Sequence, residues 1–425
     1  MKLENKVSVK DFYRKASRVN ITDANDNKIA SFTHYLHHSN SSFSKIYRHG
    51  AVDYVKEVLG DKFPGNEVSQ EVAESTLQYH LFDLKKVVPF PRPKLEKFKF
   101  IDLFSGIGGF RIAMQNLGGS CVFSSEWDKY SQKTYEANFG EVPFGDITKK
   151  ETKDYIPTGF DVLCAGFPCQ AFSIAGKRGG FEDTRGTLFF DVAEIIKKHK
   201  PKAFMLENVK GLSNHDKGRT LATILNVLRN DLNYYVPDPE VMNAKNFGVP
   251  QNRERIFIVG FRKDLGVNEF KYPAPGGEKV KISDILEEAE VSVKYYLSTQ
   301  YLNTLIAHRA RHESKGNGFG YSIISNDDVA NAVVCGGMGR ERNLIYDHRL
   351  TNFVPVTHIK GEVNREGIRK MTPREWARLQ GFPDKFKIVV ADTQAYRQFG
   401  NSVAVPAIQA TAEKIIERIE ACLKN

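Results

Sequence analysis

The sequence predicts an α/β fold in which helices cover a parallel sheet, with a smaller mixed domain after the sheet and a helical extension before it. Two observations predict it. Five short apolar segments between residues 97 and 261 alternate with amphipathic stretches, as strands and helices do in a parallel sheet. Hydrophobic residues make up 41% of the 425 residues and charged residues 26%, the balance of a globular chain rather than a fibrous or disordered one.

Changes in composition along the chain divide it into five parts. Residues 1–86 are polar and helical in pattern, and residues 87–98 form a linker because their three prolines cannot continue a helix. Residues 99–262 carry the alternating strands and helices. Glycine clusters among basic residues mark residues 263–370 as a separate small domain, and residues 371–425 form a C-terminal segment.

The sequence marks both ends of a short helix in the C-terminal segment. Thr372 is a typical N-cap, Pro373 suits the first helical position, and Glu375 completes a capping box with Thr372. Gly381 is a typical stop signal. We therefore expect a helix that begins at Pro373 and ends before Gly381.

Composition and cysteine content exclude several classes of protein. No segment approaches the eighteen or so apolar residues of a membrane helix, and the N-terminus lacks the apolar core of a signal peptide, so a cytoplasmic protein is expected. The five cysteines include no Cys-x-x-Cys pair, which indicates neither a disulfide framework nor a metal site. With 61 basic and 51 acidic residues, the net charge of +10 favours a polyanionic partner.

A glycine-rich turn after the first apolar segment predicts a nucleoside site. Gly106 opens the turn, but Arg111 stands where a dinucleotide-binding turn would have glycine, so another nucleoside suits the turn better. Glu126 follows the next segment, where a carboxylate can accept hydrogen bonds from ribose hydroxyls, and Trp127 could cover an adenine face. Asp146 could meet the adenine amino group. The alternative is a structural turn beside surface acids.

A cysteine, a glutamate and two arginines follow the ends of later segments. Cys169 comes directly after a strand end, where open α/β sheets gather ligands, whereas Cys164 lies on the apolar strand itself and reads as a buried side chain. Glu207 ends the next strand. Arg253 and Arg255 are two residues apart and share one face of a strand. Such a group suits addition of a thiolate to an electron-poor ring, with the carboxyl group sharing a proton with the ring.

Six segments together resemble the ordered motifs of bacterial DNA (cytosine-5-)-methyltransferases. They are FIDLFSGIGGFRIA, GFPCQAFSIAG, ENVKG, QNRERIFIVG, TPREWARLQGFP and YRQFGNSVAVPAI. The resemblance covers residues 99–425 and implies a Rossmann-like sheet that uses S-adenosylmethionine. It makes residues 99–262 the catalytic and cofactor-binding domain, residues 263–370 the target recognition domain, and residues 371–425 a segment that returns to the catalytic domain.

The resemblance implies a role for each matching residue. Cys169 would attack carbon 6 of the target cytosine, Glu207 would contact the ring nitrogen and amino group, and Arg253 and Arg255 would steady that site. The residues that match cofactor contacts are Phe104, Gly106, Ile107, Gly108, Gly109, Glu126, Trp127, Asp146, Ile147, Pro168, Asn401 and Ser402. No metal is implied.

The resemblance also implies double-stranded DNA as the partner, with the target base rotated out of the helix. The residues placed to help are Gln170, Ser173, Lys177 and Arg178, the last two in a glycine-hinged basic loop that could also be a plain surface loop. Arg340 and Arg342 are candidates for reading guanine edges in the major groove. Ala332, Val333 and Val334 stand where the family often has a threonine and an aliphatic residue, so a phosphate contact by a hydroxyl is absent there.

The amino-acid sequence of the recognition segment resembles that of the HpaII-like branch, which methylates 5′-CCGG. The shared stretches are RHESKGNGFGY, GGMGRERN and IKGEVNREGIRKMTPREWARLQGFPD. We therefore expect a monomeric modification enzyme of a restriction-modification system, whose cognate endonuclease is a functional partner. Alternatives are a CCNGG or CCWGG site, a transfer-RNA cytosine methyltransferase, a nicotinamide-dependent oxidoreductase, and a catalytically idle DNA-binding regulator. Residues 1–86 match nothing in the family and are expected to serve as a structural cap or an appendage.

Overall fold

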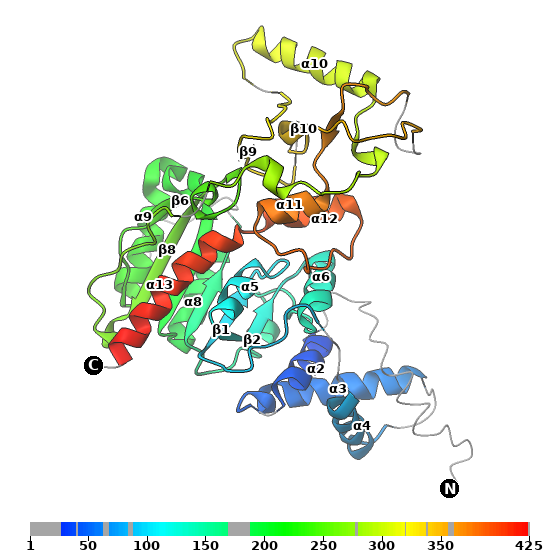
Figure 1. The fold of residues 1–425 in the computed structure, drawn as a ribbon. Helices are drawn as coiled ribbons and strands as arrows, with labels where there is room; N and C mark the ends of the chain where they lie inside the picture. The colour runs from blue at the N-terminus through cyan, green and yellow to red at the C-terminus, as the bar shows by residue number, and fades with distance from the viewer. Residues whose placement is uncertain are drawn as a thin grey trace.

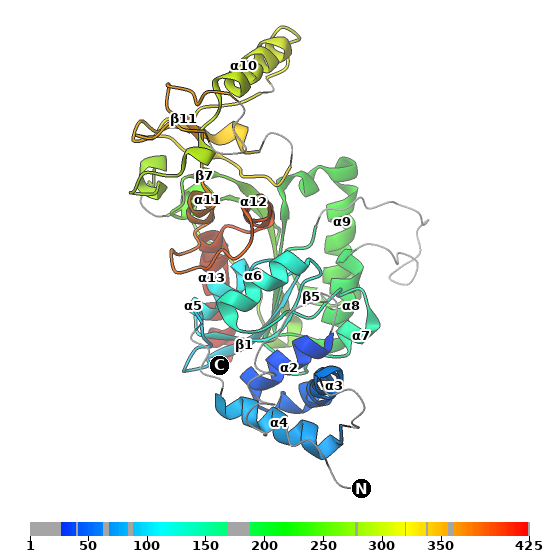
Figure 2. The same cartoon turned by 90° about the vertical axis from the view of Figure 1, so that its right-hand side faces the viewer.

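The structure is a computed structural model in which a mixed sheet lies between two peripheral regions (Figure 1). It describes residues 27–39, 41–62, 68–83, 88–168, 188–276, 279–318, 320–336, 339–355 and 361–423. Figures 1 and 2 show the N-terminal helices at one end of the molecule and the region around helix α10 at the other. Within these residues, no helix is both long and apolar enough to span a membrane.

The central sheet has seven strands in the order β2-β1-β3-β4-β8-β5, with β6 also paired to β8. Its strands are β1 (Phe98–Leu103), β2 (Gly119–Ser125), β3 (Val162–Ala165), β4 (Ala203–Val209), β5 (Tyr234–Tyr235), β6 (Glu240–Asn243) and β8 (Glu254–Arg262). Five of them, β1, β2, β3, β4 and β8, are the apolar segments that the sequence singles out. Their side chains are buried almost throughout, as expected for strands covered on both faces. The predicted α/β class is confirmed.

The expectation of a wholly parallel sheet is wrong for one half of it. Strands β2, β1, β3 and β4 run parallel, but β8 runs antiparallel to β4, with Val209 opposite Arg255. A fully buried apolar run carries no signal of its direction, so the sequence could not show this reversal. The reversal brings the beginning of β8 to the edge where the parallel strands end, which is where the candidate site lies.

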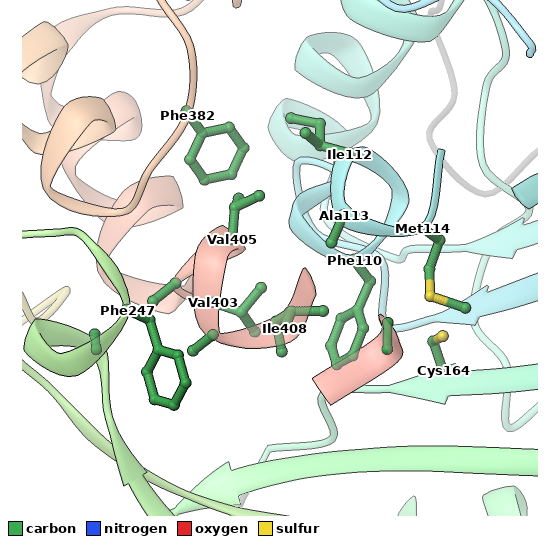
Figure 3. Close-up of a cluster of buried hydrophobic side chains, with 14 of the residues drawn as sticks. Phe110, Ile112, Ala113, Met114, Cys164, Phe247, Phe382, Val403, Val405 and Ile408 are labelled. Carbon is green, nitrogen blue, oxygen red and sulfur yellow. The ribbon is translucent and has the colours of Figure 1, made fainter. Parts of the chain in front are cut away.

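Helices cover the sheet, and the C-terminal helix lies on the same side as the helix of the glycine turn. These helices are α5 (Gly109–Asn116), α6 (Lys129–Phe139), α7 (Lys150–Lys153), α8 (Leu188–His199), α9 (Arg219–Asn226) and α13 (Val405–Leu423). Figure 3 shows Phe110 and Ala113 of α5 facing Val403, Val405 and Ile408 from the chain's C-terminal part, all buried. This apolar contact holds the C-terminal part of the chain against the helix that follows the glycine turn.

The C-terminal segment carries two further helices, α11 (Pro373–Leu379) and α12 (Asp392–Asn401). The capping box is confirmed, because the Glu375 amide donates to Thr372 Oγ1 (3.1 Å) and the Thr372 amide donates to Glu375 Oε2 (2.8 Å). Gly381 follows with a φ of 76°, a left-handed conformation that favours glycine.

Residues 263–370 contain little regular structure in their described part. Helix α10 (Thr299–Glu313) packs over β10 (Leu344–Tyr346) and β11 (Ile368–Lys370) through a small cluster that includes Leu302 and Leu305. The short strand β9 (Ala330–Asn331) pairs with β7 (Gln251–Asn252), directly before β8. The region is thereby tied to the start of β8.

In the described part of the chain before the sheet, three helices are present: α2 (Asn27–His38), α3 (Ser44–Lys62) and α4 (Gln70–Asp83). They have a small core of their own around Phe32, Val55 and Leu77. A helical pattern was expected before residue 86. The sequence did not show that α2 and α3 also pack against the sheet beside β2 (Figure 1).

Candidate active site

A pocket of about 840 Å³ opens where strands β1, β2, β3 and β4 end. Helix α12 and the start of β8 close its other side. Thirteen of the residues that the sequence assigns to catalysis or cofactor binding line it: Phe104, Gly106, Gly109, Glu126, Trp127, Asp146, Ile147, Pro168, Glu207, Arg253, Arg255, Asn401 and Ser402. Residues as far apart in sequence as Phe104 and Ser402 therefore share one cavity.

Two of the predicted cofactor residues lie behind the pocket wall. Ile107 is buried in the core, and Gly108 has a φ of 89° as the N-cap of α5. A Cβ at Gly108 would come within 2.2 Å of Phe139, so glycine is required there for close packing. These two residues therefore shape the turn rather than the cavity surface.

The glycine turn holds an unusual backbone at the pocket. Phe104 has a φ of 55°, a left-handed conformation that is uncommon for a bulky residue. Gly106 follows with a φ of 54°, and a Cβ there would meet no atom within 4 Å, because the position faces open space. The turn thus presents bare backbone to the cavity, which is what a closely held ligand requires.

Glu126 is bound to the turn from the end of the neighbouring strand. Its Oε2 accepts from the Gly106 amide and its Oε1 from the Asp128 amide, both at 2.8 Å. Burial raises the pKa of Glu126, and these amide hydrogen bonds oppose the rise. A carboxylate oxygen can accept more than one hydrogen bond, so Glu126 can also bind hydroxyl groups of a ligand. The Trp127 side chain beside it is 68% exposed and lines the same cavity.

Glu207, near the end of β4, is the second buried glutamate that lines the pocket. Its Oε1 lies 3.1 Å from Nε of Arg255, and the side chain is only 9% exposed. Burial raises the pKa of Glu207, although Arg255 and Arg253 both act to lower it. The result is a carboxyl group that keeps a proton at higher pH than an exposed glutamate does. Such a group suits proton exchange with a ring nitrogen.

Arg253 connects three parts of the chain beneath this carboxylate. Its Nη1 donates to the Val333 carbonyl (2.8 Å), within residues 263–370, and its Nη2 donates to the carbonyls of Gly400 (3.3 Å) and Ser402 (2.5 Å). Burial lowers the pKa of Arg253 to about 9. The two arginines therefore act differently, since Arg255 contacts Glu207 and Arg253 joins the backbone segments around it.

The structure leaves some predicted residues away from the pocket. Arg340 places its guanidinium 5.4 Å from the Tyr396 ring centre, and Arg342 is exposed, but neither lines the cavity. Cys169 and four predicted DNA contacts lie outside the described residues: Gln170, Ser173, Lys177 and Arg178. Pro168, which directly precedes Cys169 in the chain, lines the pocket.

One face of α12 contributes pocket residues that the sequence interpretation missed. Gln394, Arg397 and Gln398 line the cavity together with Asn401. Their spacing of three and four residues places all four on one side of a helix, so polar periodicity was an available signal. Gln398 is also fixed by Thr134, whose hydroxyl lies 3.1 Å from its Oε1.

Comparison with known proteins identifies the family of the chain. A family model described as C-5 cytosine-specific DNA methylase matches residues 98–417. The type II methyltransferase M.HpaII of Haemophilus parainfluenzae is 69% identical over 366 residues, which is 86% of this chain and 99% of the relative. The type II methyltransferase M.HhaI of Haemophilus parahaemolyticus is 41% identical over 330 residues, or 76% of this chain and 95% of the relative.

A solved structure shares the fold. The S. pombe Dnmt2 methyltransferase superposes with a TM-score of 0.57 at 22% identity, covering 76% of this chain and 99% of that one. The predicted Rossmann-like sheet is thereby confirmed. The family match spans most of the chain and includes every described pocket residue named above. The chain belongs to the family of C-5 cytosine-specific DNA methylases.

Proposed function

We propose that the chain transfers a methyl group from S-adenosylmethionine to carbon 5 of a flipped-out cytosine in duplex DNA, as the modification enzyme of a restriction-modification system. The observation that carries the proposal is the single pocket in which Glu207, held by Arg255, lies across from Glu126 and the glycine turn. One half suits a pyrimidine ring and the other a nucleoside cofactor.

The pocket residues fit the cofactor by their chemistry. Glu126 would accept hydrogen bonds from the ribose hydroxyls, Trp127 would cover the adenine, and Asp146 would accept from its amino group. The bare backbone at Gly106 leaves room for the ligand's approach. When bound, S-adenosylmethionine supplies an activated methyl group. The residues named above would hold the nucleoside part of the cofactor in the pocket.

The chemistry on the cytosine ring would fall to Cys169 and Glu207. The Cys169 thiolate adds to carbon 6, and Glu207 gives or shares a proton at the ring nitrogen, so that carbon 5 becomes electron-rich. Carbon 5 would then take the methyl group as the sulfur–methyl bond of S-adenosylmethionine breaks, and S-adenosylhomocysteine would leave. Loss of the carbon 5 proton to water would return an electron pair to the ring and expel the Cys169 thiolate. The ring nitrogen would give its proton back to Glu207, which restores the enzyme.

The proposed target is 5′-CCGG, read by residues 263–370. The support is the 69% identity to M.HpaII over nearly its whole length, together with the wording of the recognition segment. Arg340 and Arg342 are proposed to read guanine edges. Residues 99–262 are proposed to form the catalytic and cofactor-binding domain, and residues 371–425 the C-terminal segment that returns to it.

Transfer of tritiated methyl groups into matched duplexes tests the proposal. Duplexes containing ACCGGT, which includes CCGG but neither CCNGG nor CCWGG, should be labelled, while CCWGG duplexes and transfer RNA should not. Bisulfite sequencing of the product should place the methyl group on cytosine carbon 5. Label in CCWGG or CCNGG alone would replace the target and keep the chemistry, whereas label in transfer RNA alone would overturn the DNA substrate. No label in any of them would overturn the proposed function.

Replacing Glu126 with alanine should raise the Kd for S-adenosylmethionine by about tenfold to a hundredfold, because hydrogen bonds to a charged group contribute about 1.5–3 kcal/mol. Titration calorimetry without DNA measures this. Asp161→Ala is the matched control, because Asp161 also accepts a backbone amide of the sheet, that of Lys99 at 2.8 Å, but does not line the pocket. Equal losses in both variants would contradict the assignment of Glu126.

A further inference from the structure

An edge segment, residues 141–147, runs outside strand β2 and leads into the pocket. The Phe144 amide donates to the Ser124 carbonyl (2.8 Å), and the Glu126 amide donates to the Phe144 carbonyl (2.7 Å). The segment therefore pairs with the sheet at its edge. Asp146 and Ile147, both in the pocket wall, follow this pairing at once.

Side chains of helix α2 take two amides of the edge segment. The Val142 amide donates to Thr33 Oγ1 and the Gly145 amide to Asn27 Oδ1, both at 3.0 Å. Asn27 Nδ2 also donates to Thr152 Oγ1 (3.1 Å) in α7. An edge without a further strand leaves such amides unpaired, so α2 satisfies groups that the sheet does not.

Apolar contacts hold the same segment from the same side. Ile147 is buried in one cluster with Ala30 of α2 and Tyr47 of α3. The Phe144 ring lies between the rings of His34 and Tyr155, each with its centre 4.8 Å away. The segment therefore has the pocket on one side and the N-terminal helices on the other.

The orientation of the Asp146 carboxylate depends on this backbone. Its Oδ1 accepts from the Thr148 amide (2.9 Å) and from the Thr148 hydroxyl (2.8 Å). A shift of the Gly145 peptide would therefore move the carboxylate together with the turn. The family match begins at residue 98, so the residues that hold this turn from outside are not part of it.

We propose that Asn27 and Thr33 are positioning residues for the cofactor pocket. By binding the amides of Gly145 and Val142, helix α2 fixes Asp146 and Ile147 where the adenine end of the cofactor is held. The inference rests on the proposed function, because it takes S-adenosylmethionine as the ligand. It assigns residues 27–62, which the family match does not cover, to the working of the pocket.

Asn27→Ala and Thr33→Val in the full-length chain test this role. S-adenosylhomocysteine is the probe, titrated without DNA by calorimetry. Each variant should bind it about three- to tenfold more weakly, the loss expected when the hydrogen bond to the Gly145 or the Val142 amide is removed. Hydrogen exchange at the Gly145 and Val142 amides, measured without any ligand, should become faster. The KM for S-adenosylmethionine should rise, while kcat and the KM for DNA at saturating cofactor should stay constant.

Conservative variants separate positioning from a loss of folding. Asn27→Asp and Thr33→Ser each keep an oxygen that can accept the amide, so affinity should return to within about twofold of the parent. Glu57→Gln is the control. Glu57 of α3 pairs with Lys28 of α2 (2.6 Å), and both side chains are exposed.

Three outcomes would overturn the inference. The first is affinity unchanged in both Asn27→Ala and Thr33→Val while the parent binds the probe, which leaves the proposed function intact. The second is an equal loss in Glu57→Gln or in the conservative variants, which would show a structural role only. The third is a parent that does not bind S-adenosylhomocysteine, which would also overturn the proposed function.

Discussion

Replacing Glu207 with alanine will lower kcat for methyl transfer by about 10²- to 10⁴-fold, the usual contribution of a positioned acid or base. The carboxyl group is nearly buried and lies 3.1 Å from Arg255, in the part of the pocket assigned to the cytosine ring. Affinity for S-adenosylhomocysteine should change little, since Glu126 and the glycine turn hold the other end. Single-turnover kinetics with a CCGG duplex and calorimetry measure the two effects separately.

The pH dependence of the rate gives a second measurement of the same group. Burial raises the pKa of Glu207, so its protonated form persists to higher pH than in an exposed glutamate. If this proton is used at the ring nitrogen, the single-turnover rate should fall as pH rises through that raised pKa. Glu207→Gln has no titrating group at this position and should lose that decline together with most of the rate.

Glu254→Ala is the matched control for the Glu207 variants. Glu254 lies between the two arginines in sequence, but its carboxylate is exposed and pairs with Lys210 (3.0 Å) instead of lining the pocket. Its removal should leave kcat within about twofold, as for other exposed ion pairs. A Glu207→Ala enzyme that turns over as fast as Glu254→Ala would contradict the proposed role.

The sequence predicts the strands and pocket residues well because both follow from local chemistry. Buried strands are continuous apolar runs, and the carboxyl ends of parallel strands meet at one edge, so Glu126 and Glu207 could be expected together. The direction of β8 depends on contacts distant in sequence and could not be predicted. The same limit hid the docking of α2, because Asn27 and Gly145 are 118 residues apart.

Arg111 has a structural role that the sequence did not indicate. In the sequence it argues against a dinucleotide-binding turn, because glycine is expected at that position. In the structure its side chain is fully buried and forms two hydrogen bonds with Glu141, at 2.7 and 3.1 Å. Its guanidinium also lies 4.7 Å from the Phe139 ring centre. The arginine thus joins the helix of the glycine turn to the edge segment, which no sequence spacing indicated.

Replacing Glu141 with alanine will lower the free energy of unfolding by about 3–5 kcal/mol, because the charge of Arg111 would stay buried without its partner. Burial alone would raise the pKa of Glu141, but Arg111 outweighs it and holds this pKa well below the usual range. Three histidines of α2 lie 3.7–4.0 Å from the carboxylate: His34, His37 and His38. Burial lowers the pKa of His34 to about 4, so at neutral pH the cation that balances Glu141 is Arg111.

Urea unfolding of the full-length chain measures this loss. The double variant Arg111→Met with Glu141→Leu should be much more stable than Arg111→Met alone or Glu141→Leu alone, because it removes both charges at once. A double variant whose loss equals the sum of the single losses would show that the two charges do not stabilise each other.

The same cluster sets the direction of the pH dependence. The pKa of His34 falls from 6.5 in the unfolded chain to about 4 in the fold, so the unfolded state binds more protons between these values. The stability contributed by neutral His34 is therefore complete above pH 6.5 and is lost as pH falls toward 4. The lowered pKa of Glu141 acts in the same direction below its unfolded value of 4.5. In urea unfolding of His34→Phe, the free energy of unfolding should depend less steeply on pH between 6.5 and 4 than in the parent. An unchanged dependence would show that His34 is already charged in the fold.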